Sequence, residues 1–153
     1  KNLSQNIAHF GFSFLILSIL FNNIFSTEII TNLKIGETFQ SKKFKINFES
    51  IDQKNEKNFK AIIGKFNIEN LNGIVEILNP ELRIYNQPNV VTSEADIKTN
   101  LLSDRFITMN LVPNQEYFNV RYQNKPFMIW IWFSVLLISV GGILSLFKKK
   151  YES

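Results

Sequence analysis

The feature that most constrains this chain is an apolar run of 21 residues, 127 to 147, that contains no charged side chain. The run reads FMIWIWFSVLLISVGGILSLF. At about 1.5 Å per residue, a helix of this length spans roughly 31 Å, which is the thickness of the hydrocarbon layer of a bilayer. The run therefore predicts a transmembrane helix over residues 127–147. Trp130 and Trp132 near its start are typical of the membrane–water interface on the outer side.

A second apolar run extends from Ile7 to Phe21 and is interrupted only by one histidine and two serines. With the asparagines that follow, it reaches the length of a membrane span, and it predicts a transmembrane helix over residues 3–25. A cleaved signal peptide is the alternative, because Lys1 precedes the run. No small-x-small cleavage pattern follows, since NNIFSTE places bulky side chains there. We therefore favour the transmembrane helix.

Charge is distributed unevenly along the chain. Residues 26–126 hold 13 basic and 12 acidic side chains, whereas KKK at 148–150 directly follows the second helix. The positive-inside rule places the 148–153 tail in the cytoplasm and the 26–126 domain on the periplasmic side of a bacterial inner membrane. The intermembrane side of a mitochondrial inner membrane is the alternative. The net charge of +4 comes without a basic stripe interleaved with aromatic residues, so no nucleic-acid partner is expected.

Between the helices the apolar pattern changes to a period of two, which is typical of β-strands. Asn-Gly at 72–73 marks a turn, Gly64 is a candidate β-bulge, and TSEADIK at 92–98 is the one segment for which a helical turn is predicted. Six or seven short strands favour a small sandwich or barrel. The expected fold is a membrane protein in which two transmembrane helices flank an outward-facing, mostly-β domain. The candidate strands cover residues 44–48, 59–69, 70–78, 82–85, 105–109 and 116–122.

Small and polar residues fall on distinct stripes when the apolar runs are drawn as helices. The first helix carries two stripes, about 120° apart around its axis. Small side chains let another helix approach closely, and polar ones are expected to face protein rather than lipid, so two stripes predict a bundle that other polypeptides complete. The first stripe holds Ser4, Ala8, Gly11, Ser18 and Asn22, with Leu15 between them; the second holds Gln5, His9 and Ser13; the second helix has a weaker seam of Ser134, Gly141 and Ser145.

Few groups in the sequence are suited to catalysis. There is no cysteine, no G-x-S-x-G motif and no glycine-rich phosphate loop, and no catalytic residue is predicted. Glu81 and Arg83 in PELRIY could bind an anion, although an ion pair between them is the simpler interpretation. Glu94, Asp96 and Asp104 have no metal-ligand spacing and are expected to be solvated.

His9 is the only histidine of the chain, and it lies in the first predicted membrane helix. Neutral imidazole is a common ligand of haem iron, and an imidazole withdrawn from water requires a partner. The alternative is a structural histidine at a helix end, bonded to headgroups, to water or to a neighbouring helix. If His9 binds haem, the second axial ligand must come from another polypeptide, unless Met128 or Met109 serves.

Six short motifs occur in a fixed order around the pattern of helix, β domain and helix. They are AHFG in the first helix, STE after it, then NFKA, PELRIY and TSEADI, and finally KPFMIWIW before a helix that contains GG. In this order they resemble the C-terminal region of the CcmF family, the haem lyase component of the cytochrome c maturation (System I) machinery. The likeness covers nearly the whole chain. The resemblance implies haem b held between transmembrane helices, with the histidine of the AHFG motif, here His9, as an axial ligand of the iron.

The resemblance also implies partners and limits. The partners would be the remaining CcmF-type helices, other cytochrome c maturation subunits, a haem chaperone and apocytochrome c. The sequence departs from the family at two places. Ile129 stands where the family motif PFxRWIW has an arginine, and residues 104–110 read DRFITMN where the family has DLYVALG. The family's tryptophan-rich haem-presenting segment, external histidines and other haem-ligating histidine have no counterpart in this sequence. A split or truncated C-terminal piece that does not ligate haem to protein by itself is therefore implied.

Together these observations predict a two-pass membrane component of a cytochrome c haem lyase complex, with His9 as a metal ligand to a haem b shared with another polypeptide or with a missing N-terminal region. The alternative is a non-catalytic, membrane-anchored scaffold, in which the β domain binds a partner protein and His9 is structural. Haem content distinguishes the two.

Overall fold

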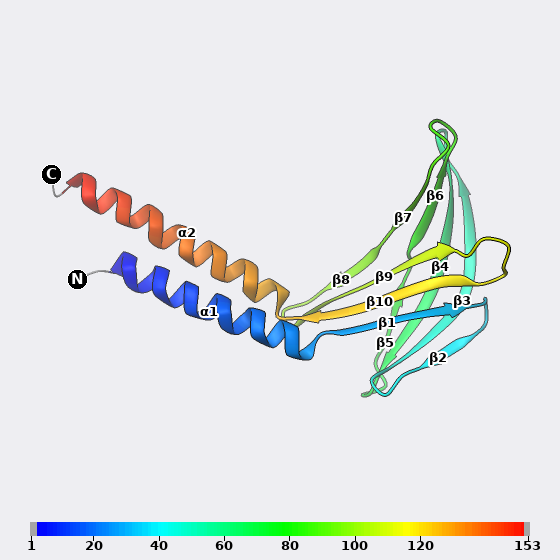
Figure 1. Ribbon diagram of the computed structural model, residues 1–153, viewed down its shortest axis with the longest axis horizontal. Helices are drawn as coiled ribbons and strands as arrows, with labels where there is room; N and C mark the ends of the chain where they lie inside the picture. Colours follow the sequence, from blue (N-terminus) through cyan, green and yellow to red (C-terminus); the bar gives the residue numbers. More distant parts are fainter. Residues whose placement is uncertain (1–2, 152–153) are drawn as a thin grey trace. The chain divides into compact units, whose positions relative to one another are not determined.

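The computed structural model describes the backbone of residues 3–151 and the side chains of residues 3–147. The predictions for Lys1 and for the side chains of the 148–153 tail lie outside the described residues. The chain forms two compact units. Of the described residues, the helical unit comprises 3–27, 99–104 and 124–151, and the β unit comprises 28–98 and 105–123. Figure 1 labels the helices and strands of both.

The helical unit contains the two antiparallel helices α1 (Leu3–Phe25) and α2 (Met128–Tyr151). Both apolar helices predicted from the sequence are present, and both are long and apolar enough to cross a membrane. Most of their large apolar side chains are exposed, as expected of helices whose outer surface lipid covers. α1 ends where the backbone N–H and the hydroxyl of Ser26 both donate to the carbonyl oxygen of Asn22, at 2.9 and 2.6 Å.

Two glycines set how closely α1 and α2 approach each other. A Cβ atom on Gly141 would lie 2.8 Å from both the backbone nitrogen of Ala8 and the carbonyl oxygen of Ser4. A Cβ atom on Gly11 would lie 3.0 Å from side-chain atoms of α2. The small-residue stripe predicted on α1 therefore packs against the second helix of the same chain, as small residues at a helix interface allow. The buried residues of this interface are Ser4, Gly11, Ser18, Ser134 and Gly141, whereas Ser145 of the predicted seam is exposed.

The β strands form two sheets. One has the order β1-β10-β9-β8, and the other has the order β2-β3-β4-β6-β7, with β5 pairing beside β4. The sequence predicted six or seven strands, and the additional ones are short or lack a clear alternation. The strands are β1 (Thr27–Leu33), β2 (Thr38–Gln40), β3 (Phe44–Asn55), β4 (Phe59–Asn70), β5 (Val75–Leu78), β6 (Glu81–Tyr85), β7 (Val91–Glu94), β8 (Asp96–Thr99), β9 (Ser103–Leu111) and β10 (Phe118–Pro126).

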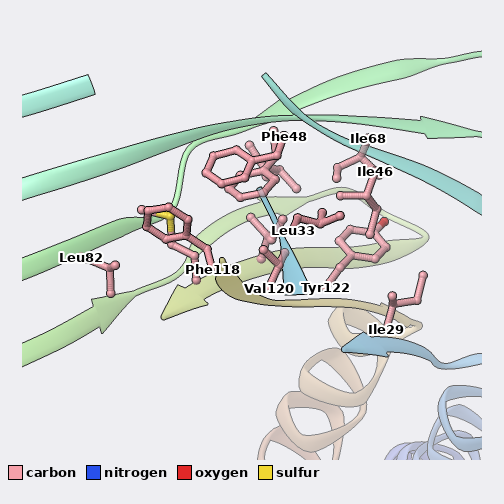
Figure 2. Packing of buried hydrophobic residues seen from close by; sticks show 13 residues of the cluster. Ile29, Leu33, Ile46, Phe48, Ile68, Leu82, Phe118, Val120 and Tyr122 are labelled. Carbon is pink, nitrogen blue, oxygen red and sulfur yellow. The ribbon is translucent and has the colours of Figure 1, made fainter. Parts of the chain in front are cut away.

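One hydrophobic core receives side chains from both sheets, as Figure 2 shows. Alternation along the strands produces this core, because every second side chain of a strand points to the same face. The rings of Phe48 and Phe66 are stacked with centroids 4.3 Å apart, and Phe118 packs edge-on against Phe48 at 5.3 Å. The expected sandwich, rather than a βαβ arrangement, is therefore the observed architecture.

The helical turn predicted at 92–98 is wrong, because this segment forms the strands β7 and β8. The side chains expected to cap a helix have other partners. The hydroxyl of Ser93 donates to the carbonyl oxygen of Met109 at 2.7 Å, and the hydroxyl of Thr92 donates to the carboxylate of Glu94 at 3.1 Å. Within residues 3–151, α1 and α2 are the only helices.

The β-bulge predicted at Gly64 is also wrong. The register shift lies on the partner strand, between Phe48 and Ser50 of β3, and Gly64 pairs with Ile51 in regular register. A Cβ atom on Gly64 would lie 2.7 Å from the sulfur of Met109 and equally close to the ring of Phe66. Glycine is therefore required there because the core packs against the backbone.

Candidate functional site

His9 lies on the side of α1 that does not contact α2. The position is about 100° around the helix axis from Ala8 and about 200° from Gly11. Its side chain is exposed, as are those of Gln5 and Ser13 on the same stripe. α1 therefore packs its small-residue stripe against α2 and turns the His9 stripe away from it.

The imidazole of His9 is not held by the neighbours on its own stripe. The hydroxyl of Ser13 donates to the backbone carbonyl oxygen of His9 at 3.0 Å, a common bond for serine in a helix. Within residues 3–147 the ring itself has no hydrogen-bond partner. Both ring nitrogens thus remain available, one to ligate a metal and the other to be fixed by an acceptor.

Neither methionine of the chain is placed to share an iron with His9. Met109 is fully buried in the hydrophobic core of the β unit. Met128 begins α2, whereas His9 lies beside the helical turn that carries Gly141. About 12 residues of α2 separate Met128 from the turn beside His9, which at 1.5 Å per residue is roughly 18 Å along the helix axis. Within the described residues, neither methionine is therefore placed as a second candidate ligand beside His9.

The other polar groups singled out from the sequence do not form a site. Glu81 and Arg83 form the ion pair that was the simpler interpretation, with Nη2 to Oε2 at 3.0 Å. The hydrogen bond to Glu81 raises the pKa of the Arg83 guanidinium, and this cation is already paired with a carboxylate. The pair is not on a sheet edge, because β6 lies between β4 and β7. Within the described residues, no three His, Asp or Glu side chains come together as a metal site.

The acidic residues expected to be solvated are only partly so. Asp96 accepts a hydrogen bond from the backbone N–H of Asn79 at 2.6 Å, and Glu94 accepts one from Thr92. The Oδ1 atom of Asp104 is buried without a hydrogen-bond partner. Two of these carboxylates thus have hydrogen-bond partners within the protein. Within the described residues, none of the three lies in a cluster that could hold a cation.

Hydrogen bonds connect the C-terminal end of α1 and the N-terminal end of α2 to neighbouring backbone. The side-chain amide of Asn22 donates to the carbonyl oxygen of Pro126 at 2.6 Å, and the backbone N–H of Phe127 donates to the carbonyl oxygen of Leu102 at 2.9 Å. Phe127 adopts a φ of 63°, in the left-handed region, where the chain turns from β10 into α2. These bonds could not be predicted from the sequence, because they join residues that are far apart along the chain.

An apolar pocket of about 120 Å³ lies between the helices near this end. Its walls are mostly aromatic, and Phe14 contacts Trp130 edge-on with centroids 5.8 Å apart. Pockets that enclose even drug-sized ligands are several hundred Å³ in volume. This pocket is therefore too small to hold a haem. The pocket is lined by Phe14, Leu17, Ser18, Phe21, Phe127 and Trp130.

Comparisons with known proteins agree in what they find. A family model described as the CcmF C-terminal β-sandwich matches residues 24–126. A cytochrome c-type biogenesis protein CcmF from Haemophilus influenzae is 29% identical over 148 residues, which cover 95% of this chain and 22% of that protein. The CcmF protein of Escherichia coli is 25% identical over 145 residues, with the same two shares of 95% and 22%.

A solved structure agrees with the fold. The structure described as the cytochrome c haem lyase CcmF matches with a TM-score of 0.66 and 17% identity, over 92% of this chain and 24% of that one. The chain spans about a fifth of the length of the curated relatives it matches.

Proposed function

Because the chain belongs to the CcmF C-terminal β-sandwich family, we propose that it acts as the C-terminal part of a cytochrome c haem lyase and supplies His9 to a b-type haem. The observation that carries the proposal is the position of the imidazole. It is exposed on α1, faces away from α2, and has no hydrogen-bond partner within residues 3–147. When bound, a b-type haem supplies one-electron chemistry, and a neutral imidazole is a usual ligand for its iron.

The haem is held jointly by residues of this sequence and by groups outside it, on another polypeptide or in a missing N-terminal region. The described residues fit one axial ligand only, since Met109 is in the β core and Met128 is about 18 Å along the helix from the level of His9. The chain also spans only about a fifth of its curated relatives. The second ligand and the groups that attach haem to apocytochrome c are therefore supplied by the remaining CcmF-type helices or by other maturation subunits, with a haem chaperone as donor.

The two helices cross the inner membrane, and the β unit lies on its outer side. Their exposed apolar surfaces and their length support the crossing. The KKK sequence at 148–150 supports a cytoplasmic end for α2. In this arrangement, the His9 stripe faces the neighbouring helices of the complex, because an unpartnered imidazole is costly against lipid.

The test compares two variants on the same stripe of α1, in the complex reassembled with its partner chains. His9→Ala is expected to lose the absorbance of the b-type haem and to regain part of it when imidazole is added. Ser13→Ala is the matched control, and it is expected to retain the haem, because the Ser13 hydroxyl bonds the backbone of His9 and not its ring.

Retention of a full and spectrally unchanged haem complement by His9→Ala would refute the ligand assignment. The non-catalytic scaffold would then be the better account of the chain. Loss of haem from both variants without rescue by imidazole would also count against ligation, because it would indicate a general disturbance of α1.

A further inference from the structure

We propose that the turn between β8 and β9, residues 100–102, is a third membrane anchor, in which Leu101 and Leu102 insert into the lipid interface. This proposal rests on the proposed function in one respect, namely that α1 and α2 cross a bilayer. The lipid contact is made by phospholipid headgroups and the first part of their acyl chains. The turn belongs to the helical unit together with both helices.

The two leucines are unusually exposed for adjacent apolar residues. Leu101 is 68% exposed and Leu102 is 67% exposed. Isolated exposed leucines are ordinary on protein surfaces, but consecutive ones at the tip of a turn form an apolar projection that gains from removal from water. Residues 99–103 carry no charged side chain, so nothing in the tip opposes its entry into the interface.

Hydrogen bonds place the turn at the level where the helices leave the membrane. The carbonyl oxygen of Leu102 accepts from the backbone N–H of Phe127, the residue directly before α2, at 2.9 Å. The side chain of Asn22, in the last turn of α1, reaches the carbonyl oxygen of Pro126 at 2.6 Å. The tip is therefore tied to the start of one apolar helix and, through the adjacent residue, to the end of the other. Its apolar surface lies next to the lipid-facing surface of these helices.

Most of the backbone N–H groups of the turn are already hydrogen-bonded, which favours entry into a medium without water. The side-chain oxygen of Asn100 accepts from the N–H groups of Leu102 and Ser103, at 2.9 and 2.8 Å. The N–H of Asn100 donates to the carbonyl oxygen of Ser103 at 3.1 Å. With the bond from Phe127, most polar groups of the tip have partners within the protein. The turn is thus preorganised to present two leucines, with the amides of Asn100, Leu102 and Ser103 already hydrogen-bonded.

The test uses the absence of cysteine from the chain. Single-cysteine variants of the full chain, Leu101→Cys, Leu102→Cys, Thr99→Cys and Leu136→Cys, are labelled with an environment-sensitive fluorophore. They are then reconstituted in vesicles of phosphatidylcholine and phosphatidylglycerol. Some vesicles contain a lipid with a nitroxide near the headgroup and others a lipid with a nitroxide near the end of the acyl chain, and iodide serves as the aqueous quencher. Thr99 is the matched control on the same hairpin, and Leu136 reports the middle of α2.

The labels at 101 and 102 are expected to show blue-shifted emission, strong quenching by the headgroup-proximal nitroxide and protection from iodide. The label at 99 is expected to be quenched by iodide. When Leu101→Asp is added to the Leu102→Cys variant, iodide is expected to quench the label at 102, because a carboxylate at the tip opposes insertion.

Two results would overturn the proposal, and they are distinguishable. If the label at 136 is quenched by the chain-end nitroxide while those at 101 and 102 respond to iodide as 99 does, the helix crosses the membrane and the turn does not enter it. If the label at 136 escapes the chain-end nitroxide, the membrane crossing itself fails, and the anchor fails with it.

Discussion

Gly141→Ala tests the close packing of α1 and α2, and the same substitution at the adjacent Gly142 provides the control. A methyl group at 141 would lie 2.8 Å from the backbone nitrogen of Ala8 and from the carbonyl oxygen of Ser4. Backbone atoms in a helix cannot move aside as a side chain would, so the helices must separate or shift. Overpacking of this kind costs about 1–3 kcal/mol.

The control is Gly142→Ala, where a Cβ atom would meet no atom within 4 Å. Both substitutions gain about 1 kcal/mol from the higher helix propensity of alanine. The difference between the two variants therefore isolates the contact, and it is expected to be about 1–3 kcal/mol, or roughly 5- to 150-fold in the equilibrium between packed and separated helices.

The assay is tryptophan fluorescence of the chain during titration of mild-detergent micelles with a denaturing detergent. Trp130 contacts Phe14 of α1 edge-on at 5.8 Å, so its emission is expected to change when the helices separate. The midpoint for Gly141→Ala should fall below that for Gly142→Ala. Equal midpoints for the two variants would refute the inferred packing.

Three further predictions concern other parts of the chain. Asn22→Ala is expected to lower the free energy of helix separation by about 1–2 kcal/mol, because it leaves the carbonyl oxygen of Pro126 without its donor. The midpoint of the same titration should therefore fall, and an unchanged midpoint would count against this bond. Burial raises the pKa of Tyr122 above its ordinary value of 10.0, so its contribution to stability is present below that pH and is lost as the pH rises further. Tyr122→Phe should reduce this alkaline loss, measured by circular dichroism, and an identical pH profile would contradict the burial of the phenol. A protease added to intact spheroplasts should cut the chain between residues 26 and 126, whereas cleavage only in inverted vesicles would reverse the proposed orientation.

The helices could be predicted because a membrane-length apolar run has few other structural uses. The small-residue stripe of α1 likewise predicted a closely packed neighbour, since Ser4, Gly11 and Ser18 recur on one face. The identity of that neighbour was not predictable from α1 alone. It follows from the fit of Gly141 against Ala8, which depends on how the two helices are aligned.

The errors arose where local signals competed with strand pairing. TSEADIK carries helix-capping residues, but Leu82 pairs with Ser93, and the ladder between β6 and β7 determines the structure of this segment. Glycine in a strand often marks a bulge, and this general tendency favours a bulge at Gly64. Its actual role, to make room for the Met109 side chain, depends on a strand more than 40 residues away along the sequence.

The candidate site was only partly visible in the sequence. The period of α1 placed His9 on a different stripe from Gly11, and the structure has these residues on different sides of the helix. The bond from Ser13 to the backbone of His9 could not be distinguished in advance from a bond to its ring. The position of the Leu101–Leu102 tip was also hidden, because it depends on the long-range bond to Phe127.

The most direct test of the account is the detection of a nitrogen–iron bond from His9. The chain contains a single histidine, so production of this chain alone with ¹⁵N-histidine labels one imidazole. The labelled chain is then reassembled with unlabelled partner chains, and the ferric haem is examined by electron–nuclear double resonance. Ligation of the iron by His9 predicts a strong hyperfine coupling from ¹⁵N, as expected for a directly bonded imidazole nitrogen. A complex that holds its full haem content and shows coupling only from ¹⁴N would contradict it.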